Sequence, residues 1–197
     1  MKNALLALLV AALAAPVLSA QAPASSAAPS KNPVVAIKTS MGTIKVELYP
    51  DKTPATVANF LQYVKDKFYD GLIFHRVING FMIQGGGHDA KLAPKAGSAP
   101  IKNEAKTGVK NELGTIAMAR TGDPDSATSQ FFINVANNQP LDYRGDGPRE
   151  IGYCAFGKVI AGMDVVDKIK AVPTGTQNGV PNVPITPVVI ESIRLEK

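Results

Sequence analysis

Alternating apolar and polar residues near the middle of the first hundred positions predict a β-hairpin. The segments 34–39 and 43–48 both alternate in this way, and Met41-Gly42 lies between them. A period of two is typical of a strand that buries one face, and glycine favours the tight turn that joins two such strands. The residues expected on the buried face of the second strand are Ile44, Val46 and Leu48.

Two segments have the spacing of amphipathic helices. In the first, Thr53 offers an N-cap and Pro54 a favoured first helical residue. Apolar residues then recur at intervals of three and four, which predicts a helix of about four turns. These residues are Val57, Phe60, Leu61, Val64 and Phe68. A second, shorter helix is predicted from Met163 to Ala171, directly after Gly162.

The rest of the apolar pattern consists of short runs separated by Gly, Pro, Asn and Asp, which favours an antiparallel sheet or barrel over a parallel α/β fold. These runs are 73–78, 81–84, 115–119, 131–136, 153–160 and 187–195. The stretch 88–114 is poor in β-branched and aromatic residues, so we expect a long irregular loop there. Long loops in compact domains are often functional.

The N-terminal residues differ in composition from the rest of the chain. Residues 1–20 have a basic start, an apolar run and small residues at Ser19 and Ala20, which is typical of a secretory signal peptide. An uncleaved membrane anchor is the alternative, but the run is shorter than a membrane span of roughly twenty residues. Residues 21–33 are rich in Ala, Pro and Ser and predict a flexible linker. One folded domain is then expected over 34–197.

Charge and cysteine content exclude several kinds of site. The formal charge is +5, but the basic residues are scattered among 16 acidic ones, so a nucleic-acid groove is not indicated. The single cysteine, Cys154, allows no disulfide within the chain and no zinc cluster based on cysteines. His88-Asp89 has no further ligands at metal spacing, so no metal site is expected.

Three segments carry the candidate chemistry: FHRVINGFMIQGG at 74–86, GTIAMAR at 114–120 and SATSQFFI at 126–133. Their order and spacing closely resemble the signature of the cyclophilins, a family of peptidyl-prolyl cis-trans isomerases. The run 156–163 extends the resemblance, which covers nearly all of 34–197. A motif of this length with two ordered companions is far more specific than an isolated glycine pattern.

The resemblance implies a mainly β fold: a closed eight-stranded antiparallel β-barrel capped by two α-helices, with a shallow proline-binding groove on its outer face. It implies an enzyme with no cofactor, no metal and no covalent intermediate. Matched by position, the catalytic arginine is Arg76. The groove residues that bind substrate are Phe81, Met82, Gln84, Ala119, Gln130, Phe132, Leu141 and Tyr153.

Arginine suits this chemistry. Resonance in the X-Pro amide gives a rotation barrier of about 18–20 kcal/mol, so unaided isomerisation takes tens to hundreds of seconds. Twisting the bond leaves a lone pair on the prolyl nitrogen. The guanidinium of Arg76 would donate a hydrogen bond to that lone pair, which stabilises the twisted state and not the planar one. Its permanent charge and planar shape favour this role.

Considered without the resemblance, several of these residues have structural explanations. An isolated Arg76 would more often be a surface or salt-bridging arginine, and neighbouring aromatic residues usually fill cores. Phe131 and Phe132 are adjacent and would face opposite sides of a strand, so only one can line the groove; the resemblance selects Phe132. For the same reason His75 is interpreted as structural and not as a general base. The run 85–87 lacks the Lys-Ser or Lys-Thr pair of a phosphate-binding loop and is interpreted as a turn.

The chain departs from better-known cyclophilins at three positions. Pro140 stands where many have a tryptophan, and the chain has none, so cyclosporin binding is expected to be weak. Tyr153 replaces a groove histidine, and a polar insertion covers 142–150. These changes resemble the bacterial periplasmic branch. Arg120 stands where an asparagine often binds the substrate backbone, and the sequence assigns it no role.

The sequence therefore predicts a monomeric isomerase that acts on proline-containing unfolded or flexible polypeptides, in the periplasm or secreted, without stable membrane insertion. The main alternative is a chaperone or assembly module that holds prolines with incidental turnover, although a pure binder would not need Arg76. A hydrolase is disfavoured, because no nucleophile elbow surrounds Ser129.

Overall fold

The computed structural model describes residues 32–196. The predicted signal peptide, 1–20, and nearly all of the predicted linker, 21–33, lie outside the described residues. Within 32–196, no helix is long and apolar enough to cross a membrane.

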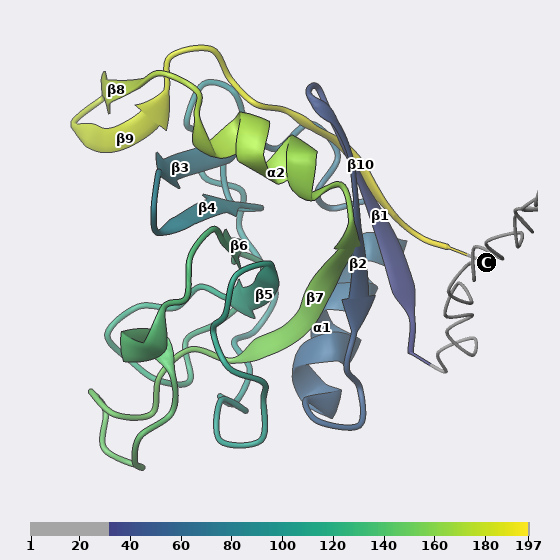
Figure 1. Ribbon diagram of the computed structural model, residues 1–197, viewed down its shortest axis with the longest axis vertical. Coiled ribbons are helices and arrows are strands. Elements are labelled where there is room, and N and C mark those ends of the chain that lie inside the picture. Colours follow the sequence, from purple (N-terminus) through teal and green to yellow (C-terminus); the bar gives the residue numbers. More distant parts are fainter. Residues whose placement is uncertain (1–31, 197) are drawn as a thin grey trace, which may run out of the picture. The chain divides into compact units, whose positions relative to one another are not determined.

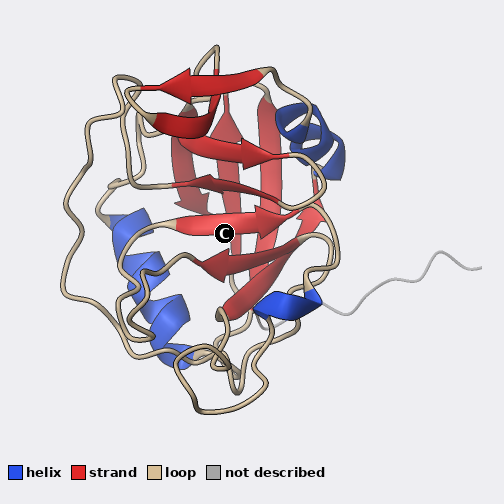
Figure 2. Ribbon diagram, turned by 90° about the vertical axis from the view of Figure 1, so that its left-hand side faces the viewer, coloured by secondary structure: helices blue, strands red, loops and turns tan. Residues whose placement is uncertain are grey.

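One strongly curled eight-stranded sheet forms the body of the domain (Figures 1 and 2). Every neighbouring pair of strands in it is antiparallel, in the order β10-β1-β2-β7-β5-β6-β4-β3. The strands are β1 (Val34–Thr39), β2 (Gly42–Leu48), β3 (Phe74–Ile78), β4 (Met82–Gly85), β5 (Thr115–Met118), β6 (Phe131–Asn134), β7 (Ala155–Ala161) and β10 (Ile190–Leu195). The mainly β class with two α-helices is confirmed.

The predicted N-terminal hairpin is confirmed. Strands β1 and β2 pair antiparallel from Val34 opposite Glu47 to Thr39 opposite Gly42. The predicted buried residues Ile44, Val46 and Leu48 have no exposed surface. Gly42 is required at the turn, because its φ is +131° and a Cβ there would lie 2.7 Å from Val165 of the second helix.

Closure of the barrel is not confirmed. The edge strands β10 and β3 do not pair with each other as strands. The segments beside them are joined by one isolated antiparallel bridge between Ile73 and Val189, and by a hydrogen bond of 3.0 Å from the Phe74 amide to the Val188 carbonyl. The resemblance implied a closed eight-stranded barrel, whereas the described sheet is an open, strongly curled half-barrel.

Helix α1 (Pro54–Lys65) begins at the predicted proline, but it ends earlier than predicted and its capping differs. Its 12 residues make roughly three turns, and Phe68 lies beyond its end. Thr53 makes no capping hydrogen bond with its side chain. The carboxylate of Glu104 instead accepts hydrogen bonds from the amides of Ala55 and Thr56, at 3.1 and 2.8 Å. A residue nearly fifty positions away therefore caps the helix.

The C-terminal part adds the second helix and a small hairpin. Helix α2 (Met163–Lys170) matches the predicted segment and buries Val165, Val166 and Ile169. The strands β8 (Thr174–Gln177) and β9 (Val180–Pro184) form a separate two-stranded sheet that the apolar pattern did not predict. Only two of their nine residues are buried, so they carry little of the apolar alternation from which a strand is recognised.

The core lies inside the curl of the sheet and beneath α1. Phe131 has no exposed surface and meets Phe60, Tyr69 and Phe74 edge to face, with ring centroids 5.5–6.1 Å apart. Such edge-to-face pairs stabilise a core beyond the burial of their area. The predicted burial of Cys154 is confirmed, and burial raises the pKa of its thiol to about 12.

Candidate functional site

Strand register sets the outer row of side chains in the candidate site. Arg76 on β3 pairs with Gln84 on β4, Gln84 pairs with Phe132 on β6, and Phe132 pairs with Ala117 on β5. Residues that pair directly across a sheet project to the same face. Four segments separated in sequence therefore contribute one continuous row.

A β-bulge directs Arg76 into this row. The register between β3 and β4 shifts between Phe74 and Arg76, so that His75 is the extra residue. A bulge bends the strand and re-aims the side chains that follow it. Because of it, Phe74 lies in the core while Arg76, two residues on, lies on the outer face.

His75 is directed away from this row, against His88. The two ring centroids are 4.3 Å apart, and the Nδ1 atoms of both rings are buried without a hydrogen-bond partner among the described residues. Burial, together with the neighbouring His88, lowers the pKa of His75 from 6.5 to about 4. The ring is therefore neutral at pH 7, as expected for a structural histidine.

The outer row is part of a groove of about 120 Å³. Its lining residues are Arg76, Phe81, Met82, Gln84, Ala119, Arg120, Phe132, Leu141 and Tyr153. Of the residues proposed from the sequence, all but Gln130 line this one groove. Gln130 is linked to the groove through its hydrogen bond with Gln84.

A chain of polar contacts crosses the groove. Arg76 Nη1 donates a long hydrogen bond of 3.4 Å to Gln84 Oε1, and Gln84 Nε2 donates one of 3.0 Å to Gln130 Oε1. The orientation of the Gln84 amide is thus set from both sides. Gly87 makes room for Gln130, because a Cβ at Gly87 would lie 2.5 Å from the Gln130 side chain. The glycine run at 85–87 therefore serves close packing.

The floor of the groove is a small apolar cluster on the outside of the sheet. Its buried members are Met82, Ala117, Phe132 and Ala155, and Phe81, Leu141 and Tyr153 pack against them. This cluster is separate from the interior core. The cluster gives the groove an apolar bed, and the guanidinium of Arg76 lines the same groove.

Tyr153 and Arg120 also line the groove and contact each other. The Tyr153 ring meets Phe132 edge to face at 5.8 Å, and the Arg120 guanidinium lies 4.6 Å from the centroid of the Tyr153 ring. A cation over an aromatic face is a favourable contact. The residue that replaces a histidine of the family is therefore an aromatic support for both a groove side chain and a second arginine.

A buried amide network, not predicted from the sequence, supports the groove from behind. Asn138 Nδ2 donates to the carbonyl oxygen of Phe81 at 2.8 Å. Asn111 Nδ2 donates to the carbonyls of Leu141 at 3.1 Å and Tyr153 at 3.2 Å. Asn134 connects the two, since it donates to Asn111 and accepts from Asn138. Asn111 precedes the second candidate segment, whereas Asn134 and Asn138 follow the third, so no local pattern marks the three asparagines as a unit.

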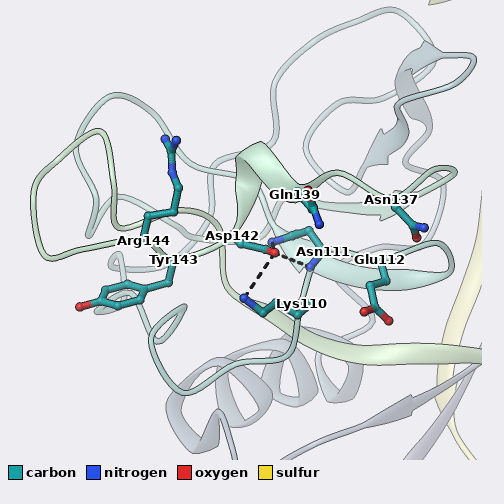
Figure 3. A pocket seen from close by; sticks show the side chains of 8 residues that line it. All are labelled: Lys110, Asn111, Glu112, Asn137, Gln139, Asp142, Tyr143 and Arg144. Carbon is teal, nitrogen blue, oxygen red and sulfur yellow. Dashed lines mark hydrogen bonds and ion pairs between the residues drawn. The ribbon is translucent and has the colours of Figure 1, made fainter.

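A larger cavity of about 380 Å³ lies beyond the 3-10 turn η1 (Gln139–Leu141), which carries Leu141 (Figure 3). It is lined by Lys110, Asn111, Glu112, Asn137, Gln139, Asp142, Tyr143 and Arg144. Asp142 accepts hydrogen bonds there from the Asn111 amide at 2.7 Å and from Asn111 Nδ2 at 3.2 Å (Figure 3). All of its lining residues have polar or charged side chains, and Asp142 and Asn111 are already paired with each other, so we assign the chemistry to the smaller groove.

No cluster of three or more His, Cys, Asp or Glu side chains that could hold a metal ion occurs within residues 32–196. In the groove itself, the groups available for chemistry are two guanidinium groups, the amide of Gln84 and a phenol. The groove offers no activated nucleophile, so it is suited to binding and to stabilising a distorted ligand.

Comparison with known sequences agrees with this geometry. Residues 34–195 match the family described as "Cyclophilin type peptidyl-prolyl cis-trans isomerase/CLD". A peptidyl-prolyl cis-trans isomerase of Acinetobacter baylyi is 55% identical over 84% of this chain and 86% of its own. The peptidyl-prolyl cis-trans isomerase B of Escherichia coli is 51% identical over 83% of this chain and 100% of its own.

Solved structures show the same likeness. A cyclophilin-type isomerase of Cryptosporidium parvum superposes with a TM-score of 0.72 at 28% identity, over 84% of this chain and 98% of that one. A second crystal structure of that protein, determined in the presence of the dipeptide Ala-Pro, gives a TM-score of 0.71 at 28% identity over 83% of this chain and 99% of that one.

Proposed function

The chain belongs to the cyclophilin-type peptidyl-prolyl cis-trans isomerase family and is a peptidyl-prolyl cis-trans isomerase, and from this premise we propose that Arg76 is its catalytic residue. The observation that carries the proposal is the placement of the Arg76 guanidinium at the edge of an apolar groove, in register with Gln84 and Phe132. No other strand-borne cation lies in that row.

The substrate proline occupies the apolar bed. Phe81, Met82, Phe132 and Leu141 contact its ring and hold that half of the peptide still. The carbonyl on the other side of the X-Pro bond then rotates against the fixed ring. The related Cryptosporidium protein was crystallised in the presence of Ala-Pro, which supports a proline dipeptide as the minimal ligand of this groove.

Arg76 stabilises the twisted state of the bond. As conjugation is lost, the prolyl nitrogen becomes pyramidal and gains a lone pair, and a guanidinium N–H donates a hydrogen bond to it. No covalent bond is made or broken, and no proton needs to leave the arginine. The Gln84 amide, fixed between Arg76 and Gln130, orients the substrate backbone. Ala119, Gln130 and Tyr153 complete the substrate-binding set.

The sequence of residues 1–20 supports a proposal for where this activity takes place. We place the enzyme in the periplasm or outside the cell after removal of residues 1–20, acting on exported polypeptides as they fold. Weak cyclosporin binding is part of the same proposal. Pro140 stands beside Leu141 where many cyclophilins have a tryptophan, and proline offers neither the large apolar ring nor the N–H donor of an indole.

Two-dimensional exchange NMR on a short Ala-Pro peptide tests the proposal. We expect fast cis-trans exchange with the unmutated domain, and a loss of roughly 100- to 1000-fold in the Arg76→Ala variant, the usual effect of removing one transition-state hydrogen-bond donor. Arg149→Ala, which removes an exposed arginine outside the groove lining, is the matched control and should keep full activity.

Each outcome of this experiment has a definite meaning. Exchange that survives in a correctly folded Arg76→Ala domain would show that another group is catalytic. Peptide binding without accelerated exchange in the unmutated protein would favour the chaperone, in which the apolar bed binds prolines and Arg76 has no part in turnover.

A further inference from the structure

The groove carries positive charge that no acidic residue offsets. Arg76 and Arg120 both line it, and its lining contains no Asp or Glu. Within residues 32–196, neither arginine lies within salt-bridge distance of a carboxylate. The catalytic proposal uses one of these charges and leaves Arg120 unexplained.

Arg120 is held in a fixed position by neutral partners. Its Nε donates to the Gly152 carbonyl at 3.0 Å and its Nη1 to the Thr121 carbonyl at 2.9 Å. One face of the guanidinium lies 4.6 Å from the ring centroid of Tyr153. These contacts orient the planar group without neutralising it, and among the described residues no hydrogen bond uses Nη2.

The carboxylates nearest in sequence are engaged elsewhere. Asp123 Oδ1 accepts from the Asp125 amide at 3.0 Å, and Asp125 Oδ1 accepts from the Asn103 amide at 2.8 Å. Asp123 thus stabilises the backbone of its own loop, and Asp125 links that loop to the segment at Asn103. A guanidinium that is pre-oriented and lacks an acidic partner is the group best suited to bind a carboxylate from a ligand.

We infer that Arg120 is a specificity-determining residue that makes this isomerase prefer X-Pro segments with an Asp or Glu within two residues of the proline. The inference rests on the proposed function, because it takes the same groove as the substrate site. An acidic side chain pairs with the unused Nη2 of Arg120, whereas a basic one is repelled by both arginines. The preference is modest because Arg120 is half-exposed.

A peptide series tests the inference. A glutamate is moved through the two positions before and the two positions after the proline of an otherwise alanine-based peptide, with glutamine and lysine peptides as references. We expect kcat/KM to be about three- to fivefold higher for glutamate than for glutamine at one or more positions, and lowest for lysine. Raising the salt to about 1 M should remove the difference, since the Debye length falls to roughly 3 Å.

Variants assign the preference to Arg120. Arg120→Gln should bring the glutamate-to-glutamine ratio close to one, and Arg120→Lys should restore part of it, since charge returns without the planar fork. Lys38→Gln also removes one positive charge, but from strand β1 and outside the groove lining. It should leave the glutamate-to-glutamine ratio unchanged. Because the ratio compares two peptides on one preparation, it does not depend on how much of a variant is folded.

The results separate this inference from the proposed function. An active enzyme with no acidic preference at any of the four positions, or a preference that persists in Arg120→Gln, would overturn the role of Arg120. Absence of turnover for every peptide with the unmutated protein would overturn the proposed function instead.

Discussion

The two faces of strands β3, β4, β6 and β5 carry out different tasks with residues that alternate along the same segments. The inner row consists of Val77, Ile83, Ile133 and Ile116, each at most 2% exposed. The outer row consists of Arg76, Gln84, Phe132 and Ala117. The inner row is uniformly aliphatic, whereas the outer row mixes a cation, an amide, an aromatic ring and a small residue.

This contrast shows how a stable sheet can carry a polar site. The interior of the curl supplies the burial that stabilises the fold. The outer face then needs only a thin apolar layer, and it can hold a guanidinium at the edge of solvent. The account therefore predicts that neighbouring residues of one strand differ in what their substitution affects: stability on the inner face, substrate handling on the outer.

Phe131 and Phe132 provide the strongest test of this difference. Phe131→Ala removes a ring with no exposed surface that packs against Phe60, Tyr69 and Phe74, and should lower the free energy of unfolding by about 3–5 kcal/mol. Phe132→Ala should cost less stability but lower kcat/KM by about tenfold or more, because the proline loses its bed. Chemical denaturation and a peptide isomerisation assay measure the two effects.

If either alanine variant does not fold, the milder pair Phe131→Leu and Phe132→Leu keeps the comparison. Phe131→Leu should be the less stable of the two variants, and Phe132→Leu should be the less active. The same order in both measurements would mean that the two faces are not separable.

His75, the extra residue of the bulge, should affect stability in a pH-dependent way without affecting substrate binding. The pKa of His75 is about 4 in the folded protein and 6.5 in the unfolded chain, so between these values the unfolded state binds more protons. The contribution of the neutral His75 ring to the free energy of unfolding is fully present above pH 6.5. It falls by about 3 kcal/mol as the pH decreases to 4. Burial also lowers the pKa of His88, which acts in the same direction.

Unfolding measured from pH 7.5 to 4 checks this dependence. His75→Gln should flatten the slope relative to the unmutated protein, while its activity at pH 7.5 stays nearly unchanged because His75 lies outside the groove. A large loss of activity at constant stability would instead give His75 a part in catalysis.

Disrupting the buried amide network should have the smallest effect of the three. It should change both the free energy of unfolding and substrate binding. Asn138→Ala leaves Asn134 Oδ1 without its donor and leaves the Phe81 carbonyl with only the Val135 amide, and should cost about 1–3 kcal/mol of stability. It should also raise KM several-fold more than it lowers kcat, since Phe81 loses one of its two hydrogen-bond donors. The control is Asn137→Ala, an exposed neighbour whose Oδ1 accepts only from the Leu113 amide, and it should leave KM unchanged.

Much of this architecture could be predicted from local sequence. The hairpin at 34–48, the start of α1 at Pro54 and the extent of α2 follow from periodicity, glycine and proline, because these signals act between near neighbours. The residues proposed for the groove came from a long motif that resembles a known family, and the structure gathers nearly all of them around one groove.

Other features depend on contacts between distant segments. The cap of α1 comes from Glu104, the bulge at His75 depends on pairing with β4, and the asparagine network joins three separate segments. The edge between β10 and β3 likewise depends on how far the sheet curls. None of these leaves a periodic pattern in the sequence. The hairpin β8–β9, with only two buried residues among nine, lacks the apolar alternation that would reveal it.

The central claim is that proline peptides bind the small outer groove and not the larger polar cavity beyond η1. A titration of the isotope-labelled domain with an Ala-Pro peptide, followed by amide and side-chain NMR shifts, tests it directly. The account predicts the largest changes at Arg76, Met82, Gln84 and Phe132, with Asn137 and Arg144 nearly unmoved. Changes centred on Asn137, Gln139 and Arg144 would contradict it.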